Sequence, residues 1–133
     1  MAAYEVKQVL EEMKRLTRMK DLDPSKYCEE EGYADSLAQK IGKDELKPTQ
    51  LRKVFHALKD IQRTLKSQPF DRSQVMKLIP ELAYALGRGL IPKPFYDLMR
   101  ICLSKEKLQN NDDFERLMDF LTAILAYHKM RHA

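Results

Sequence analysis

Residues 111–132 read NDDFERLMDFLTAILAYHKMRH, and this stretch decides the fold class of the chain. Its apolar residues recur at spacings of three and four, which is the period of an α-helix. These inward positions are Phe114, Leu117, Met118, Leu121, Ile124, Leu125 and His128. Further apolar residues between Phe120 and Tyr127 widen the surface most of the way round the helix. Such a helix lies at the centre of a bundle or is shared with a partner, and Asn111 or Asp112 would cap its start.

The same spacing recurs through the rest of the chain, between breaks made by glycine, proline and aspartate. It predicts helices from residue 6 to before residue 21, and over residues 25–41, 48–65, 75–86 and 92–103. Pro80 should kink or restart the helix over 75–86, because its ring removes a backbone hydrogen bond. No strand-like alternation is present. We therefore expect an all-α fold, a compact bundle of five to six helices in one domain over residues 1–133.

The composition fits a protein of this kind. The 133 residues are 44% hydrophobic and 33% charged, with only 4 glycines. Cys28 and Cys102 stand far apart with no metal-ligand spacing, so we expect two reduced thiols packed as small apolar groups. The start of the chain is typical of an amphipathic helix and not of a signal peptide, and no apolar run reaches the roughly 20 residues that cross a bilayer. These features predict a cytoplasmic protein with no membrane association.

A search for catalytic groups finds none. His56, His128 and His132 are the only histidines. We expect His128 to be a hydrogen-bonded core residue, and Glu29–Glu31 to diverge around a helix, since consecutive residues point in different directions. No catalytic, metal-binding or nucleotide-binding motif occurs. The sequence thus predicts no enzyme, no metal and no cofactor.

Positive charge gathers in one segment near the middle. Residues 43–66 hold 7 basic and 3 acidic side chains, whereas residues 1–42 hold 7 and 9. Five residues of the helix expected over 48–65 and its end fall within an arc of about 80° at roughly 100° per residue. We call them the basic stripe: Arg52, His56, Lys59, Arg63 and Lys66. Lys47 and Lys53 flank the same end.

The basic stripe has three interpretations on physical grounds. Like charges at four-residue spacing repel by about 0.2–0.5 kcal/mol per pair, and a line of phosphates would offset that repulsion. Contacts to phosphates would be sensitive to salt and largely indifferent to base identity. The stripe can also be a plain solvated face, or the binding surface for an acidic protein. Tyrosines could stack on bases, but Tyr84 and Tyr127 lie in apolar helices, where we expect their hydroxyls to anchor core residues.

Three stretches together resemble the small subunit of type III-A CRISPR effector complexes, the Csm small-subunit family. The first begins the helix over 48–65 and reads TQLRKVF at 49–55, and the second reads LAYALGR at 82–88. The third is DFER at 113–116, followed by Phe120, Ala123, Ile124, Ala126, Tyr127, His128 and Lys129. Their order and spacing cover roughly residues 32–130, and the first 30 residues match nothing in the family.

The resemblance implies a small helical protein without nuclease activity, stacked in several copies beside the duplex of crRNA and target RNA. It implies contacts between basic side chains and RNA backbone. Arg52 and Lys53 match the basic pair of the family's first stretch, and Arg88 matches the arginine of its glycine–arginine motif. The candidate RNA-binding residues are Lys47, Arg52, Lys53, His56, Lys59, Arg63, Lys66 and Arg88. The expected partners are RNA, other subunits of the complex and further copies of the chain. The alternative is a helical module that associates with itself through Leu121–Tyr127 and binds no RNA.

Overall fold

The computed structural model describes residues 4–132, and every regular element in this range is helical. Six α-helices have eight or more residues, which confirms the all-α bundle of five to six helices. They are α1 (Val6–Arg15), α2 (Tyr33–Lys40), α3 (Pro48–Thr64), α5 (Leu78–Gly87), α6 (Lys93–Cys102) and α7 (Asn111–His132). The four-residue helix α4 (Ser73–Met76) and the 3₁₀ turns η1 (Met19–Asp21) and η2 (Pro24–Lys26) complete the order.

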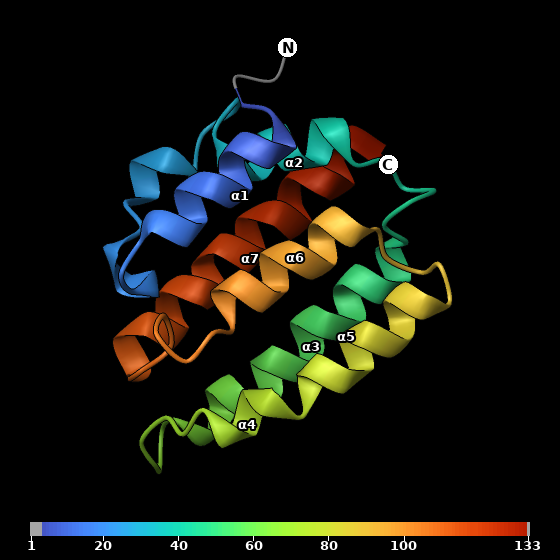
Figure 1. Ribbon diagram of the computed structural model, residues 1–133. Coiled ribbons are helices and arrows are strands. Elements are labelled where there is room, and N and C mark those ends of the chain that lie inside the picture. Colours follow the sequence, from blue (N-terminus) through green and yellow to red (C-terminus); the bar gives the residue numbers. More distant parts are fainter. Residues whose placement is uncertain (1–3, 133) are drawn as a thin grey trace.

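Helix α7 lies at the centre of the bundle (Figure 1). It packs against α2, α3 and η1, while α1 packs against α2 and α6, and α5 packs against α6. The residues that point inward, from Phe114 to Ile124, are at most 3% exposed. Leu121 and Ile124 are buried within the chain, whereas the rest of Leu121–Tyr127 is half-buried or exposed. Self-association through this segment stays a prediction.

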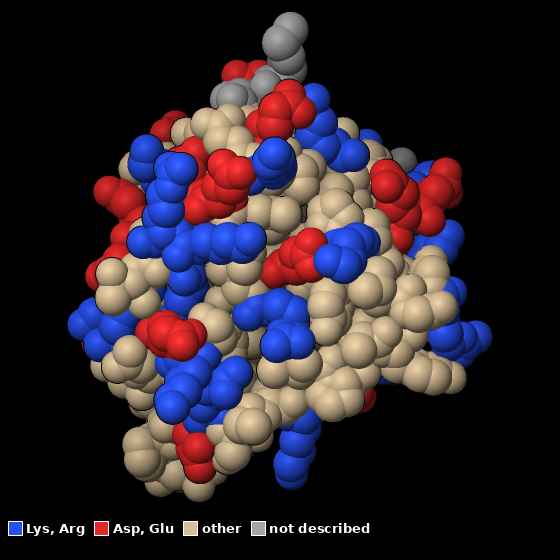
Figure 2. Space-filling view, in the orientation of Figure 1, with Lys and Arg blue, Asp and Glu red and all other residues tan. Residues whose placement is uncertain are grey.

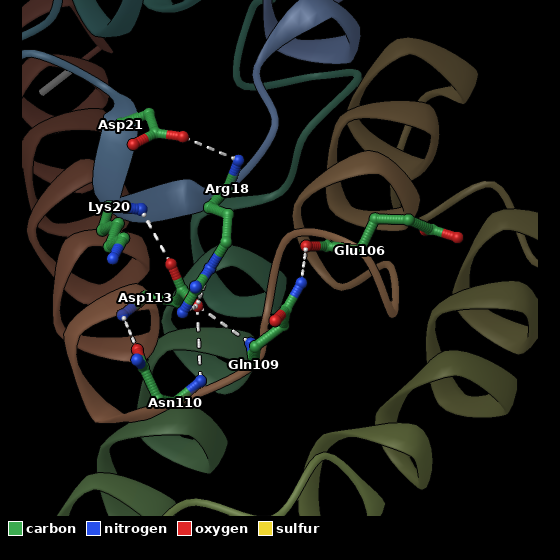
Figure 3. Close-up of polar contacts among 7 residues, drawn as sticks. All are labelled: Arg18, Lys20, Asp21, Glu106, Gln109, Asn110 and Asp113. Carbon is green, nitrogen blue, oxygen red and sulfur yellow. Dashed lines mark hydrogen bonds and ion pairs between the residues drawn. The ribbon is translucent and has the colours of Figure 1, made fainter.

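The first turn of α7 is held by Asp113, whose side chain is fully buried (Figure 3). Its carboxylate accepts hydrogen bonds from Nε and Nη2 of Arg18 at 2.9 and 2.6 Å. It also accepts from the backbone N–H of Lys20 at 3.0 Å and of Gln109 at 2.9 Å. One carboxylate thus joins the segment after α1 to the start of α7, 95 residues away.

The cap of α7 is Asn110, so the expectation of Asn111 or Asp112 was wrong by one residue. The side chain of Asn110 accepts from the N–H of Asp113 at 3.1 Å, and Asp113 accepts in return from the N–H of Asn110 at 3.3 Å. This reciprocal pair is a capping box. Asn111 instead accepts from the N–H of Phe70 at 2.7 Å and fixes the loop before α4.

The other end of α7 is held by a second buried carboxylate, that of Asp35 on α2. Arg131 donates to it from Nε at 2.9 Å and from Nη2 at 2.8 Å, which is the two-pronged geometry that suits a guanidinium and a carboxylate. The N–H of Glu31 and the amide of Gln39 also donate to Asp35. Buried ion pairs therefore fasten the N-terminal part of the chain to both ends of α7.

The first two helices are shorter than predicted. Helix α1 ends at Arg15, because the buried ammonium of Lys107 donates to the carbonyls of Lys14 and Leu16 and so satisfies its last turn. The helix expected over 25–41 begins only at Tyr33, after the turn η2 and a loop. By contrast, α3 and α6 lie within a residue of their predicted bounds, and the restart predicted around Pro80 occurs at Lys77, between α4 and α5.

Candidate nucleic-acid interface

Helix α3 sets the basic stripe on its outer side. Pro48 occupies the first helical position, where its missing N–H costs nothing. Leu51 and Leu58 are fully buried and fix the rotation of the helix against the core. All five stripe residues, Arg52, His56, Lys59, Arg63 and Lys66, are exposed. The first four lie on α3, whereas Lys66 lies in the turn after the helix ends at Thr64.

The stripe is only weakly neutralised by the chain itself. Arg63 is paired with Asp60, three residues before it on the same exposed face. The ammonium of Lys59 lies 5.9 Å from the centre of the Phe55 ring. Within residues 4–132, no ion pair involves Arg52, Lys59 or Lys66. Three cations of the stripe therefore face solvent without a carboxylate partner.

Lys47, Lys53 and Arg88 do not belong to the stripe. Lys47 is half-buried at the N-cap of α3, where its backbone N–H donates to the carbonyl of Leu90 at 3.4 Å. Lys53 and Arg88 are exposed and line a groove between α3 and α5. The structure thus divides the eight predicted residues between two neighbouring surfaces and a helix cap.

The groove between α3 and α5 has a volume of about 400 Å³. Its walls are apolar, with Val54 and Ala57 from α3 facing Leu82 and Ala85 from α5. The surface over α5 is mostly free of charged atoms (Figure 2). Around the walls stand the polar and charged residues Gln50, Lys53, Glu81 and Arg88. The sequence motifs at 49–55 and 82–88, which are distant in the chain, meet across this groove.

Tyr84 is the feature of this groove that sequence reasoning missed. Its side chain is 68% exposed, and the guanidinium of Arg88 lies 5.8 Å from the centre of its ring. The expectation that it anchors the core was wrong, because most of its side chain lies in solvent. Tyr127 is half-buried, and its hydroxyl donates to the carbonyl of Cys28 at 2.6 Å. Because Cys28 is exposed, this contact does not anchor the core. The four-residue spacing of Tyr84 and Arg88 was the signal in the sequence that could have shown the pair.

A comparison with protein-family models matches residues 25–133 to the family described as Csm2 Type III-A. The chain belongs to this family. Members of the Csm2 family are small subunits of type III-A CRISPR complexes, so the chain assembles with other subunits of such a complex. No curated protein and no solved structure gives a significant match.

The Csm2 match includes the stripe, the groove and the whole of α7, together with the Asp35–Arg131 pair. Helix α1, η1 and Arg18 precede it. The sequence alone assigned no role to this part of the chain. In the structure its role is to hold the start of α7, because Arg18 donates two hydrogen bonds to Asp113.

The Csm2 chain was also searched for a metal site. Among residues 4–132, no group of three His, Cys, Asp or Glu side chains could hold a metal ion. His128 is buried as expected, but its Nε2 has no hydrogen-bond partner in this part of the chain. Burial, with a smaller contribution from nearby His132, lowers the pKa of His128. It is a histidine held neutral in the core.

The two cysteines of the Csm2 chain differ. Both are free, but only Cys102 is buried, and its burial raises the pKa of the thiol to about 12. Cys28 is exposed, so its predicted packing was wrong. In the described part of the chain, none of the helices combines the length and the apolar character needed to cross a membrane.

Proposed function

We propose that the chain is a non-catalytic RNA-binding subunit that stacks in several copies along the duplex of crRNA and target RNA. The basic stripe of α3 would hold RNA backbone, while base pairing with the guide reads the sequence. The observation that supports this proposal is the line of exposed cations from Arg52 to Lys66, most of which have no carboxylate partner among residues 4–132. Its place of action would be the cytoplasm.

The backbone is the part of RNA that such a surface suits. Lysine and arginine side chains at four-residue spacing follow a line of phosphates, and they bind without regard to base identity. We assign no catalytic residue: Asp35 and Asp113 hold the ion pairs at the two ends of α7, and His128 lies in the core. The subunit would contribute position and charge rather than chemistry.

The test replaces two cations of the stripe that lie eleven residues apart on α3. Arg52→Glu combined with Arg63→Glu should abolish RNA binding at low salt and leave the helical circular dichroism unchanged, because both side chains are exposed. The matched control is Lys105→Glu with Lys129→Glu, which makes the same change in net charge at exposed positions away from α3. RNA binding is measured by filter retention. Equal retention by the stripe variant and the control would contradict the proposal.

A further inference from the structure

We propose that the groove between α3 and α5 binds one unpaired nucleobase of the RNA, with the base stacked on Tyr84 and its flanking phosphates held by Lys53 and Arg88. This inference rests on the proposed RNA-binding function. It goes further, because it adds a site for a base to a surface that otherwise contacts only backbone.

The exposure of Tyr84 is the first observation. Large apolar side chains are buried almost everywhere in residues 4–132, and Tyr84, at 68%, is the most exposed of the few exceptions, which also include Met76 and Met130 at 50%. An aromatic ring on the surface offers a face on which any base can stack. The guanidinium of Arg88, 5.8 Å from the ring centre, adds a second planar group that stacks on bases and pairs with phosphates.

The shape and lining of the groove are the second observation. Its volume of about 400 Å³ lies in the range of about 300–1,000 Å³ typical of small-molecule sites. The apolar walls formed by Val54, Ala57, Leu82 and Ala85 suit the flat face of a base. Gln50 stands on the same groove, and its amide offers both donors and an acceptor for the edge of a base.

Charge and continuity favour RNA over a protein segment. Lys53 and Arg88 have no ion-pair partner in the described range, and they outnumber the single carboxylate of the groove, that of Glu81. Lys53 lies about 100° round α3 from Arg52, so the groove adjoins the side of the helix that carries the stripe. Paired bases are stacked inside a duplex and out of reach, so the groove would take only an unpaired one.

The experiment compares two short fluorescent RNA duplexes, one fully paired and one with a single unpaired adenosine. Tyr84→Ala should weaken binding of the full-length chain to the second duplex by about fivefold or more and leave the first within about twofold, since stacking contributes only where a base is free. Tyr84→Phe keeps the ring and should bind as the wild type does. Arg88→Ala should weaken the binding of both duplexes. The control is Arg100→Ala, which removes an exposed arginine from a Tyr–Arg pair on α6 and should leave binding unchanged.

Each result separates this inference from the proposed function. Suppose that the stripe variant no longer binds either duplex. If Tyr84→Ala then binds both duplexes normally, or binds both more weakly by the same factor, the base site is wrong and backbone binding stands. If the wild type binds neither duplex, the proposed function fails and the base site fails with it. If Tyr84→Ala leaves RNA binding intact but changes sedimentation of the chain with its own copies, the groove is a protein site and the inference is overturned.

Discussion

At the scale of single residues, Asp113 shows how a buried charge can be tolerated. Burial by itself would raise the pKa of its carboxyl, but the guanidinium of Arg18 and the N–H groups of Gln109 and Lys20 outweigh that effect and hold the pKa below its usual range. The pKa of Asp35 is also lowered, chiefly by the hydrogen bonds from Arg131. Both carboxylates are therefore charged in the folded chain, and each depends on a partner from a distant segment.

Removing the charge of Asp113 should be costly. Asp113→Asn leaves Arg18 without its counter-ion, and breaking a buried pair on one side destabilises a protein by about 3 kcal/mol or more. Urea unfolding measures the change. Asp112→Asn is the matched control, because Asp112 is exposed and one residue away. If the control loses as much stability as Asp113→Asn, the loss comes from the acidic first turn of α7 and not from the buried ion pair.

The same two carboxylates predict an acid limit. Their pKa values in the folded state lie below the ordinary value of 3.8, so the unfolded chain takes up protons first as the pH falls. The stabilisation is fully present above about pH 4 and is lost as the pH falls through the folded pKa values. The melting temperature should therefore drop below pH 4, and it should drop less in Asp113→Asn, which has one such group fewer. An identical pH dependence in the variant would contradict this assignment.

At the scale of elements, the start of α2 depends on close approach of two backbone segments. Gly32 is the N-cap, and a Cβ at this position would lie 2.7 Å from the carbonyl oxygen of Lys26 and 3.1 Å from that of Glu29. Periodicity alone predicted one helix through this region, because Tyr27, Ala34 and Ala38 would share a helical face. The chain instead folds back at Gly32, and Tyr27 is buried against Phe120 of α7 at a ring distance of 5.4 Å.

Alanine at the two ends of α2 should have opposite effects. Gly32→Ala forces backbone to move and should cost about 1–3 kcal/mol of stability. Gly42→Ala meets no atom within 4 Å and should be neutral or stabilise by up to about 1 kcal/mol, since it restricts the unfolded chain. Thermal unfolding of the two variants provides the comparison. Equal melting temperatures would show that the loop before α2 can relax at no cost.

At the scale of the whole molecule, the chain is a compact support for one charged helix. Its formal net charge is only +4, so the proposed attraction to RNA would come from the local arrangement on α3 and not from the total. Helix α7 takes the central place, and α3 packs on it with its apolar side, which leaves the stripe outside. In the proposed function, RNA backbone would lie along the stripe, with the groove beside it.

Salt should reveal how many phosphates this surface holds. Each neutralised phosphate releases condensed ions, so the logarithm of the binding constant falls linearly with the logarithm of the salt concentration. Lys59→Gln should reduce the slope by about 1 without changing any preference between RNA sequences. Lys93→Gln should leave it unchanged, because Lys93 is already paired with Asp97 on α6. RNA titrations at several salt concentrations measure the slope for each variant. Equal slopes for Lys59→Gln and Lys93→Gln would show that the bound phosphates lie away from Lys59.

The sequence by itself determined the helices and the stripe. Spacings of three and four, together with Pro48 and Pro92, are local signals, and local geometry is enough to place α3, α6 and α7 nearly to the residue. The same geometry put Arg52, His56, Lys59 and Arg63 on one face of α3. Only the tertiary structure decided the rest. The Arg18–Asp113 and Asp35–Arg131 pairs and the meeting of Lys53, Tyr84 and Arg88 join segments that are distant in sequence, and no local period shows which distant side chains will share a buried site or the two walls of a groove.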